Sequence, residues 1–574
     1  MNMKRLPIGE SDFKKIMTGN YYYVDKSLFI KEVIDRSDTI LLLPRPRRFG
    51  KTLNISMLKY YYDCCPEIDL PGAPPNTYKN LFDNLAISQA GPQYQEQMGN
   101  HPVIFLTFKN VKELDWESCF NNIKQIIQEE YLKHNYLLNG SILKEQEIDY
   151  FKKIIDLTGN RVDYSNSLEK LLKYLNRYYG KRAVILIDEY DTPIHAGFSR
   201  KYYEEIINFM RNFLSGGLKD TGQYLEKGVI TGIMRVAKES IFSGLNNLGV
   251  YTLLSDAFSD KFGFTEKEVE TMLKDFNASD SYDDVRQWYN GYHFGKETIY
   301  NPWSIINFLA SDRKEPEPYW LNTADNQIIE SLLSNEGTEL KGELEQLIRG
   351  ESIEKTIDTN ISFIDIFSHE HTLWGFLLMG GYLKQTAKRK HAFLDETYYT
   401  LSIPNREVRI AYKRIIENYF STKIENNKLE IMLDALIQGD IPTFEEIFSD
   451  YVATSMSVFD VAGDPEKVYH AFVMGLLLWL SPRYQVKSNR ESGYGRYDIM
   501  IIPGDISKLG YVIEFKKVRK NETVESAVES ALKQIEEKKY ETELIERGIT
   551  NFKKLAIVFN RKDVVVKEKD MDCD

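Results

Sequence analysis

The stretch TILLLPRPRRFGKTLNISML, residues 39–58, runs from an apolar segment into the tripeptide Gly50-Lys51-Thr52 and then into a helix-forming sequence. A strand, a glycine-containing loop and a helix in this order form a phosphate-binding loop, in which backbone amides and the helix N-terminus point at the phosphates. The general pattern G-x-x-x-x-G-K-T is incomplete, because Arg45 stands where its first glycine belongs. The stretch therefore fits either a nucleotide site with an arginine-rich loop or a chance tripeptide on a basic loop.

Each residue of the tripeptide has an expected task in a nucleotide site. Gly50 lets the backbone approach the phosphates closely, Lys51 reaches the β- and γ-phosphates, and the Thr52 hydroxyl holds Mg²⁺. A lone Gly-Lys-Thr is weak evidence, so the assignment depends on a second motif.

An acidic pair ends a second apolar run, AVILIDEYD at residues 183–191. Asp188, at the carboxyl end of this predicted strand, can hold the Mg²⁺ shell, and Glu189 can orient or deprotonate the attacking water. A buried strand that ends in two acids is common by chance. Together with Gly-Lys-Thr in the same α/β unit, however, the pair favours the nucleotide site.

A polar residue lies near the end of a third apolar run, GVITGI at residues 228–233. The hydroxyl of Thr231, near the tip of this predicted strand, can sense the γ-phosphate or simply end the strand. Arg235 follows shortly after and can pair with phosphate or with a surface carboxylate. The sequence leaves both alternatives open.

Residues 1–255 alternate apolar, strand-like runs with amphipathic, helical stretches, which is the rhythm of a mostly parallel α/β sheet. Strands that are buried on both faces read as continuous apolar runs. The predicted strands are residues 39–44, 102–108, 183–188 and 228–233. The long separation of Lys51 from Asp188 predicts an insertion, at residues 66–100 or 110–180.

Four motifs in fixed order carry a resemblance to a known family. They are YYYVDKSLFIKEVID, RPRRFGKTLNISMLK, ILIDEYDTPI and TGIMRVAKESIFSGLNN. In this order they resemble the AAA-ATPase-like family of bacterial proteins, over residues 3–310. Members of that family carry the loop as R-P-R-R-F-G-K-T, so the missing first glycine is the family's own pattern. The resemblance implies ATP and Mg²⁺ as ligands.

The same resemblance gives four further residues an expected role. Arg47 and Arg48, which otherwise read as a solvated charge run, gain a phosphate-side or structural role. Tyr23 and Asp25 are expected near the base or the loop, unless Asp25 only caps a helix.

Two largely helical regions are expected after the ATPase core of residues 1–255. Residues 256–350, from FTEKEVETML onward, read as a helical lid. Residues 351–460 hold a helix and two strands at 373–403, which fit a small winged-helix module, and then a helical connector.

A last α/β unit is expected at residues 461–574. Asp498 lies in the predicted strand GRYDIMIIP, and Glu514 and Lys516 lie two residues apart in the next, YVIEFKKV. Period-two alternation puts Glu514 and Lys516 on one face of that strand. Carboxylates on two paired strands can share one divalent metal, and a lysine beside them can stabilise the attacking hydroxide or the phosphorane charge.

This spacing, D-x₁₅-E-F-K, resembles the PD-(D/E)xK nuclease superfamily, which implies a Mg²⁺-dependent nuclease, with Mn²⁺ as an alternative ion. Glu466 is expected to add a carboxylate from the preceding helix, and Gln534 to face the sheet from the following one. His470 reads as a metal ligand or, more commonly, as a partly buried histidine with one hydrogen bond. The plain alternative is an α/β domain with a buried Glu-Lys pair.

Composition limits the remaining classes of protein. A chain of 574 residues with a net charge of −12 fits a multidomain α/β protein and excludes one coated over its whole surface with nucleic acid, though not one basic groove. Residues 1–19 hold no apolar segment of a signal peptide, and the run AFVMGLLLWL is too short to span a bilayer. Four cysteines give neither a disulfide framework nor a zinc pattern. A cytoplasmic protein without a membrane partner is expected.

Two classes of function follow. The first is an ATP-hydrolysing domain that controls a Mg²⁺-dependent nuclease, with DNA as the expected nucleic acid and a homo-oligomer as an open alternative to the monomer. The second is a nucleotide-gated module whose nuclease fold binds nucleic acid or protein without cleavage. Intact Asp498, Glu514 and Lys516 favour the first class. The cations expected to contact nucleic acid include Lys517, Arg519 and Lys520.

Overall fold

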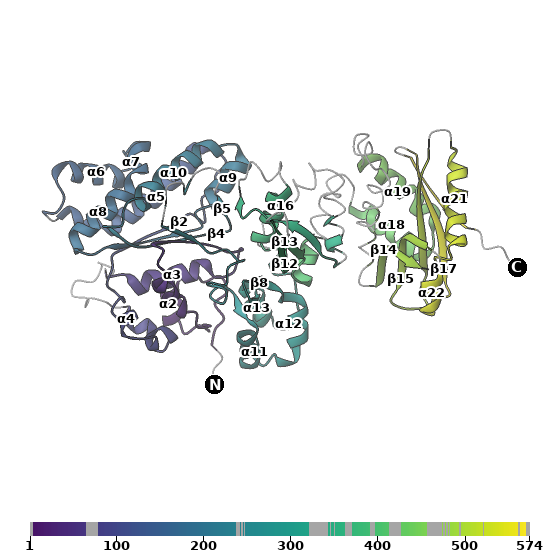
Figure 1. The fold of residues 1–574 in the computed structure, drawn as a ribbon, viewed down its shortest axis with the longest axis horizontal. Helices are drawn as coiled ribbons and strands as arrows, with labels where there is room; N and C mark the ends of the chain where they lie inside the picture. Colours follow the sequence, from purple (N-terminus) through teal and green to yellow (C-terminus); the bar gives the residue numbers. More distant parts are fainter. Residues whose placement is uncertain are drawn as a thin grey trace. The chain divides into compact units, whose positions relative to one another are not determined.

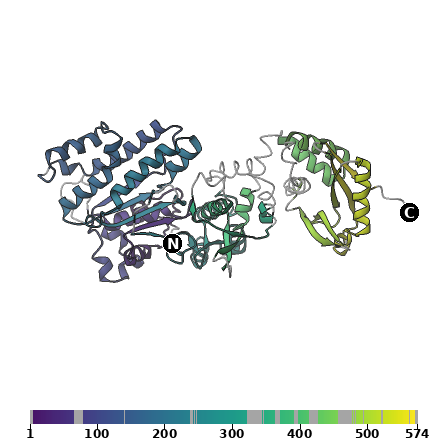
Figure 2. The same cartoon turned by 45° about the horizontal axis from the view of Figure 1, so that its top comes forward.

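The computed structural model describes most of the chain (Figures 1 and 2). The described residues are 4–64, 78–139, 141–236, 241–242, 245, 247–320, 343–344, 346–348, 350–361, 370–390, 396–412, 426–455, 473, 477, 480, 483–492, 495–519, 522–560 and 563–569. The chain divides into two compact units. The first comprises Met1–Ala324 and Glu354–Val408, and the second comprises Asp325–Ile353 and Arg409–Asp574, so the chain passes between the units three times.

A five-stranded parallel sheet forms the centre of the first unit, with the strand order β2-β3-β4-β1-β6. Its strands are β1 (Ile40–Pro44), β2 (Val103–Thr107), β3 (Ala183–Asp188), β4 (Leu225–Gly232) and β6 (Leu248–Val250). Every residue of β1 and β3 is buried, which is why both read as continuous apolar runs. The four predicted strands are confirmed, and their parallel order brings the carboxyl ends of β1, β3 and β4 to one edge.

Helices cover both faces of this sheet (Figure 1). One face carries α2 (Leu28–Asp35), α3 (Lys51–Tyr62) and α4 (Pro92–Gln95). The helices of the other face include α5 (Trp116–Lys133), α6 (Glu145–Ile155), α7 (Arg161–Ser165), α8 (Ser167–Tyr179) and α10 (Tyr203–Leu218). Helices α1 (Phe13–Thr18) and α9 (Thr192–Arg200) belong to the same part of the first unit. Since α5 to α8 stand between β2 and β3, the second of the two predicted ranges holds more helices than a single crossover needs.

The sequence of α8 shows why these segments are helical. Its buried leucines Leu168, Leu171, Leu172 and Leu175 recur at helical spacing and form one apolar face. Gly180 ends the helix in the left-handed conformation, with φ +65°, which glycine adopts without steric strain. Each buried leucine stabilises the fold by about 2 kcal/mol relative to an exposed one.

Short elements complete the first unit. Three helices follow the main sheet: α11 (Glu266–Asp275), α12 (Tyr282–Tyr289) and α13 (Pro302–Ala310). They accompany a three-stranded sheet of β7 (Phe264–Thr265), β9 (Glu297–Tyr300) and β8 (Tyr292–Phe294). A second three-stranded sheet contains β10 (Ile353–Thr356), β13 (Thr397–Ser402) and β12 (Lys384–Lys390). Helix α16 (Glu370–Met379) lies between β10 and β12 in the chain. The helix and two strands predicted within 373–403 are thus present.

The second unit contains a mixed five-stranded sheet with the order β14-β15-β16-β17-β18. The strands are β14 (Tyr484–Ser492), β15 (Gly495–Pro503), β16 (Gly510–Lys517), β17 (Phe552–Asn560) and β18 (Asp563–Glu568). All neighbours pair antiparallel except β16 and β17, which are parallel and are joined through α21 (Val524–Glu537) and α22 (Thr542–Glu546). The predicted hairpin from Asp498 to Glu514 is confirmed.

The two faces of this second sheet carry different layers. Helices α18 (Asn426–Gln438) and α19 (Ile441–Ser455) pack on one face, against inward residues such as Ile499 and Ile513. Helix α21 covers the other face, where Met500 and Val512 contact Ile535. Figures 1 and 2 show the sheet between these two layers. Because successive residues of a strand point to opposite faces, Glu514 and Lys516 share the face of α21 with Val512.

Candidate functional site

The loop between β1 and α3 takes a left-handed backbone conformation twice, at Arg48 (φ +70°) and Gly50 (φ +81°). Gly50 adopts it without strain, whereas at Arg48 it costs about 1 kcal/mol or more. Among the described residues no side chain caps the N-terminus of α3. The first amides of this helix therefore remain available to an anion.

Lys51 is the first residue of α3, and only 4% of its surface is exposed. Its Nζ donates to the carbonyl oxygens of Arg45 (3.1 Å) and Pro46 (2.9 Å). Burial lowers the pKa of Lys51, while the charges of Glu189 and Asp188 oppose that shift. The ammonium is thus held inside the loop by neutral acceptors, which a phosphate can replace.

Asp188 joins three parts of the sheet edge. Its Oδ2 accepts a hydrogen bond from Thr52 Oγ1 (2.8 Å), and its Oδ1 accepts one from Thr231 Oγ1 (2.7 Å). Both Asp188 and Thr231 are fully buried. Burial, with a contribution from Glu189, raises the pKa of Asp188. The structure therefore brings together Thr52, Asp188 and Thr231, three residues that the sequence selected separately.

Glu189 follows Asp188 at the same edge. Its backbone is left-handed, with φ +53°, and such strain in a residue other than glycine concentrates at functional sites. Its side chain lines a cavity next to the loop, and Oε2 accepts a hydrogen bond from Thr192 Oγ1 at 3.3 Å. This position suits a group that acts on a molecule bound in that cavity.

Asp191 is a residue that the motif did not single out. Its Oδ2 accepts hydrogen bonds from the amides of Ile233 (2.7 Å) and Met234 (3.1 Å), directly after β4. Burial raises the pKa of Asp191 to about 6. Asp191 thus fixes the turn that follows Thr231, and its only signal in the sequence is a third acid close to Asp188.

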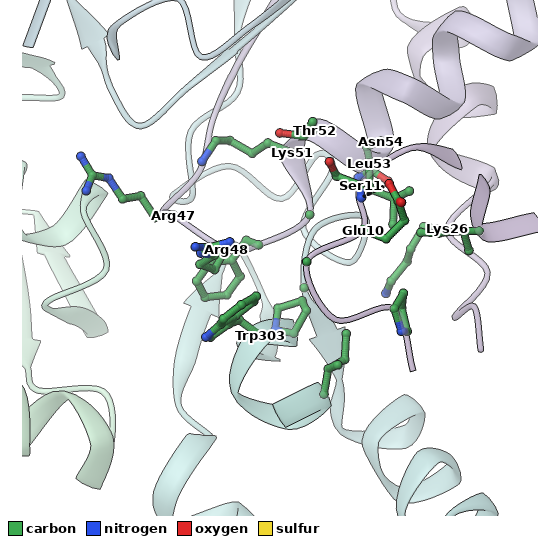
Figure 3. Close-up of a pocket in the computed structure, with 18 of the residues that line it drawn as sticks. Glu10, Ser11, Lys26, Arg47, Arg48, Lys51, Thr52, Leu53, Asn54 and Trp303 are labelled. Atoms are coloured by element: carbon green, nitrogen blue, oxygen red, sulfur yellow. Dashed lines mark hydrogen bonds between the residues drawn. The ribbon is translucent and has the colours of Figure 1, made fainter. Parts of the chain in front are cut away.

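The cavity has a volume of about 390 Å³ and opens beside the loop (Figure 3). Its walls come from the loop and the start of α3, from the N-terminal segment before α2, and from α11 and α13. Apolar lining residues include Leu6, Val24, Met272 and Ile306, and cationic ones include Lys109 and Lys112. A cavity lined by both apolar and cationic residues suits a ligand that carries both a ring and phosphates.

The two residues expected near the base or the loop take different positions. Tyr23 lines the cavity, and its hydroxyl donates to Met57 Sδ at 3.3 Å. Asp25 accepts hydrogen bonds from the amides of Ser27 (2.8 Å) and Ala86 (2.7 Å), next to the start of α2. The N-cap residue of α2 is Ser27, without a side-chain cap hydrogen bond, so Asp25 fixes the backbone before this helix and does not cap it.

Arg47 and Arg48 diverge although they are neighbours. The guanidinium of Arg48 lies over the ring of Trp303, at 4.2 Å from its centroid, whereas Arg47 points away from Trp303 (Figure 3). Burial lowers the pKa of Arg48, and the charge of Glu189 opposes this shift. Both arginines line the cavity, so both can reach an anion in it.

Arg45, at the position of the absent glycine, is fully buried. Its guanidinium donates to the carbonyl oxygens of Pro44 (2.8 Å), Tyr251 (2.7 Å) and Phe258 (3.3 Å). It also lies 4.9 Å from the centroid of the Phe262 ring, and burial lowers its pKa to about 9. Arg45 therefore holds the loop onto the segment after β6 and does not point at the cavity.

Arg235 is not among the residues that line this cavity. It lies in β5 (Arg235–Val236), which pairs in parallel with β11 (Asn360–Ile361). The structure thus places Arg235 after the turn that Asp191 holds, without a contact to Asp188 among the described residues.

A second cluster of polar residues lies under α21 in the second unit. The register of β15 and β16 pairs Ile499 with Ile513, so Asp498 and Glu514 are the next opposed residues. Asp498 Oδ2 accepts a hydrogen bond from Phe515 N (2.7 Å). Burial, and after it the charge of Asp498, raises the pKa of Glu514.

Lys516 and Gln534 complete this cluster. Lys516 Nζ donates to Glu514 Oε1 (3.1 Å) and to Gln534 Oε1 (2.7 Å). Gln534 Nε2 donates to Glu514 Oε1 and, at 3.2 Å, to the hydroxyl of Tyr540. The period-two prediction for the strand and the inward prediction for Gln534 are both confirmed. Tyr540 was missed, because it lies beyond the end of α21.

Glu514 is the most constrained member of the cluster. Only 2% of its surface is exposed, and Oε2 has no hydrogen-bond partner among the described residues. Burial, with the charge of Asp498, raises the pKa of Glu514 to about 7. A buried carboxylate oxygen without a partner is destabilising unless it is protonated or binds a cation.

Two protein-family models match the stretches of the chain that contain these two clusters. Residues 7–242 match the family described as predicted AAA-ATPase, and residues 464–569 match the PD-(D/E)XK nuclease superfamily. The chain carries an AAA-ATPase-like domain and a PD-(D/E)XK domain. These matches indicate an ATPase-type and a nuclease-type function for the two parts.

A curated relative of similar length spans both domains. It is an uncharacterised protein encoded in the vnfD 5′ region of Azotobacter chroococcum mcd 1, 26% identical over 563 residues, with 96% of this chain and 95% of the relative covered. In the part of the chain that the structure describes, none of the helices has the length and apolar character needed to cross a bilayer.

The donor set of the PD-(D/E)XK domain fits a divalent metal, because Glu514 Oε2 is buried without a partner beside the carboxylate of Asp498. The described residues contain no group of three or more His, Cys, Asp or Glu side chains that could hold a metal ion. Glu466, predicted as a third ligand, and His470 lie outside the described residues. In the AAA-ATPase-like domain, Thr52 and Asp188 provide the hydroxyl and carboxylate that Mg²⁺ prefers.

Proposed function

We propose that the AAA-ATPase-like domain binds and hydrolyses ATP and that this activity is coupled to Mg²⁺-dependent cleavage of DNA by the PD-(D/E)XK domain. The coarse ATPase and nuclease classes come from the family matches. The residue roles and the metal are proposed from the contacts and donor atoms described above, and DNA is proposed as the nucleic acid.

In the ATPase step, the amides at the start of α3 and Lys51 bind the β- and γ-phosphates. Thr52 and Asp188 hold Mg²⁺, which neutralises phosphate charge when bound. Glu189 orients the attacking water from the cavity wall, and Thr231 senses the γ-phosphate through its hydrogen bond to Asp188. Arg47 and Arg48 supply further positive charge at the same cavity.

In the cleavage step, Asp498 and Glu514 hold the divalent ion, and Glu466 is a further candidate ligand. When bound, Mg²⁺ or Mn²⁺ polarises the scissile phosphate and lowers the pKa of a coordinated water. Lys516 stabilises the negative charge that develops on the phosphate. Gln534 accepts a hydrogen bond from Lys516 Nζ and so holds the ammonium next to Glu514.

One observation favours cleavage of nucleic acid over binding alone. Glu514 is buried beside Asp498 and Lys516, with Oε2 unpaired among the described residues. A fold kept only for binding gains nothing from an unpaired buried carboxylate oxygen, which costs about 1–3 kcal/mol or more. A nucleotide-gated module that binds nucleic acid without cutting it is the second candidate, and it is favoured only if no metal supports cleavage.

Purified protein, incubated with labelled double- or single-stranded DNA or RNA and with Mg²⁺ or Mn²⁺, tests the cleavage step. We expect DNA cleavage by the wild type and its loss in Asp498→Ala and Glu514→Gln. Glu529→Gln is the matched control, because Glu529 lies exposed on α21. Cleavage of RNA alone would contradict the DNA assignment, and binding without cleavage of any substrate would favour the gated module.

A further inference from the structure

Glu407 lies one residue before the last passage of the chain from the first unit to the second, at Val408–Arg409. It is fully buried, and the proposed chemistry does not use it. Its Oε1 accepts a hydrogen bond from Trp320 N (2.7 Å), and both carboxylate oxygens accept from Ser304 Oγ, at 3.0 and 2.9 Å. A buried carboxylate with these donors is well satisfied, so its position is fixed.

Trp320, the first of these donors, lies four residues before another passage, at Ala324–Asp325. It is buried, and its ring packs against Tyr382 at 5.0 Å between centroids. The carboxylate of Glu407 therefore links the backbone at Trp320 to Ser304 of α13, a few residues before two of the three passages between the units.

Helix α13 also contacts the phosphate loop. Trp303, next to Ser304, lies under the guanidinium of Arg48 and donates from Nε1 to Tyr319 O (3.1 Å), next to Trp320. Pro302 and Trp303 line the cavity beside Lys51 (Figure 3). Trp303 thus contacts Arg48 of the phosphate loop, while its neighbour Ser304 contacts Glu407.

A bound triphosphate would change the loop side of this arrangement. The exposed stacking of Arg48 on Trp303 is weaker than a charge-assisted hydrogen bond from arginine to phosphate. Arg48 therefore has two alternative partners, Trp303 and an anion in the cavity.

We propose that α13 and Glu407 form a clamp that reports nucleotide occupancy of the phosphate loop to the backbone at Trp320 and Glu407, each a few residues before a passage to the second unit. This regulation rests on the proposed function, since it requires a nucleotide at the loop. The nucleotide draws Arg48 from Trp303, loosens the first turn of α13, and weakens the hydrogen bonds that Glu407 receives. A carboxylate that merely satisfies the core would not respond to nucleotide.

Hydrogen–deuterium exchange of the Trp320 amide tests the clamp, because this amide is itself a donor to Glu407. In the wild type, a non-hydrolysable ATP analogue with Mg²⁺ should speed this exchange about five- to tenfold, within the usual range of coupling between sites. In Ser304→Ala, nucleotide binding and basal ATP hydrolysis should persist, while exchange at Trp320 no longer depends on nucleotide. Glu407→Gln, which keeps an acceptor for Trp320 N and a partner for Ser304, should retain the dependence.

Ser167→Ala is the matched control. Ser167 is also fully buried, and its hydroxyl donates to Tyr164 O (2.7 Å) far along the chain from the connections. It should behave as the wild type. Nucleotide binding without any change at Trp320, or a full change in Ser304→Ala, would overturn the clamp alone. A wild type that binds no nucleotide would overturn the proposed ATPase step and the clamp with it.

Discussion

At the scale of single residues, Arg45 shows how a departure from a sequence pattern can be structural. The pattern expects a glycine there, yet the guanidinium of Arg45 binds the carbonyl oxygens of Tyr251 and Phe258, more than two hundred residues away. No local rule relates these positions, so the sequence alone did not reveal this role. The prediction of a close backbone approach at Gly50, by contrast, depends only on local geometry and agrees with its φ of +81°.

Arg45→Gly restores the general loop pattern and should nevertheless destabilise the protein. The change leaves buried carbonyl oxygens without donors and opens a void beside Phe262. We expect the free energy of unfolding of the first unit to fall by about 3 kcal/mol or more, measured by denaturant or thermal unfolding. Arg47→Gly is the control, because Arg47 has no comparable buried contacts, and unchanged stability of Arg45→Gly would contradict this role.

Glu189→Gln should separate ATP binding from ATP hydrolysis. The substitution keeps the size of the side chain and leaves Lys51, Thr52 and Asp188 in place, so ATP should bind with nearly unchanged affinity. Hydrolysis should fall about a hundredfold or more, because the amide cannot accept a proton from the attacking water. Radiolabelled ATP binding and phosphate release measure the two quantities. Glu204→Gln, at an exposed position of α10, should match the wild type, and wild-type turnover in Glu189→Gln would assign the water to another residue.

At the scale of elements, burial on both faces made the parallel strands predictable. β1 and β3 are buried throughout and appear in the sequence as unbroken apolar runs. In α21, helical spacing correctly turned Gln534 toward the sheet. The contacts of Tyr540 and Trp303 were not predicted. Tyr540 lies beyond the end of α21, and Trp303 of α13 meets Arg48, which is distant in the sequence.

Stability of the first unit should depend on pH through Glu407. Burial raises the pKa of Glu407 to about 7 from its ordinary value of 4.5, and the tyrosines that face it, Tyr289 and Tyr292, stay neutral because burial raises their pKa as well. Between these two values the folded state binds more protons than the unfolded state, so the free energy of unfolding falls as pH rises from 4.5 to 7.

The full contribution of this group amounts to roughly 3 kcal/mol, complete below pH 4.5 and lost above pH 7. Unfolding by denaturant across this range measures it, with Glu407→Gln as the comparison that lacks the titrating group. The wild type should lose stability relative to Glu407→Gln as pH rises. A constant difference between the two proteins would show that Glu407 is charged throughout.

At the scale of the whole molecule, the two proposed chemistries use separate sets of residues. The phosphate loop, Asp188 and Glu189 lie in the first unit, and Asp498, Glu514 and Lys516 lie in the second. The order of these motifs along the sequence was enough to predict the two families. The sequence did not predict the hydrogen bonds of Ser304 and Trp320 to Glu407, because these residues belong to no motif and come together only in the folded chain.

The net charge of −12 does not exclude a local contact with nucleic acid, because cations near the second cluster attract phosphate over a short range whatever the total charge. Lys517 is the last residue of β16, the strand that carries Glu514, and Arg519 follows it, while Lys520 lies outside the described residues.

The most direct test of the two-chemistry account measures ATP hydrolysis and DNA cleavage in parallel on the wild type, Lys51→Ala and Glu514→Gln. Lys51→Ala should lose ATP hydrolysis about a hundredfold or more, because it removes the charge that binds the β- and γ-phosphates. Glu514→Gln should keep basal ATP hydrolysis and lose cleavage by a similar factor, because it removes a metal ligand. Wild-type hydrolysis in Lys51→Ala, or wild-type cleavage in Glu514→Gln, would contradict the account.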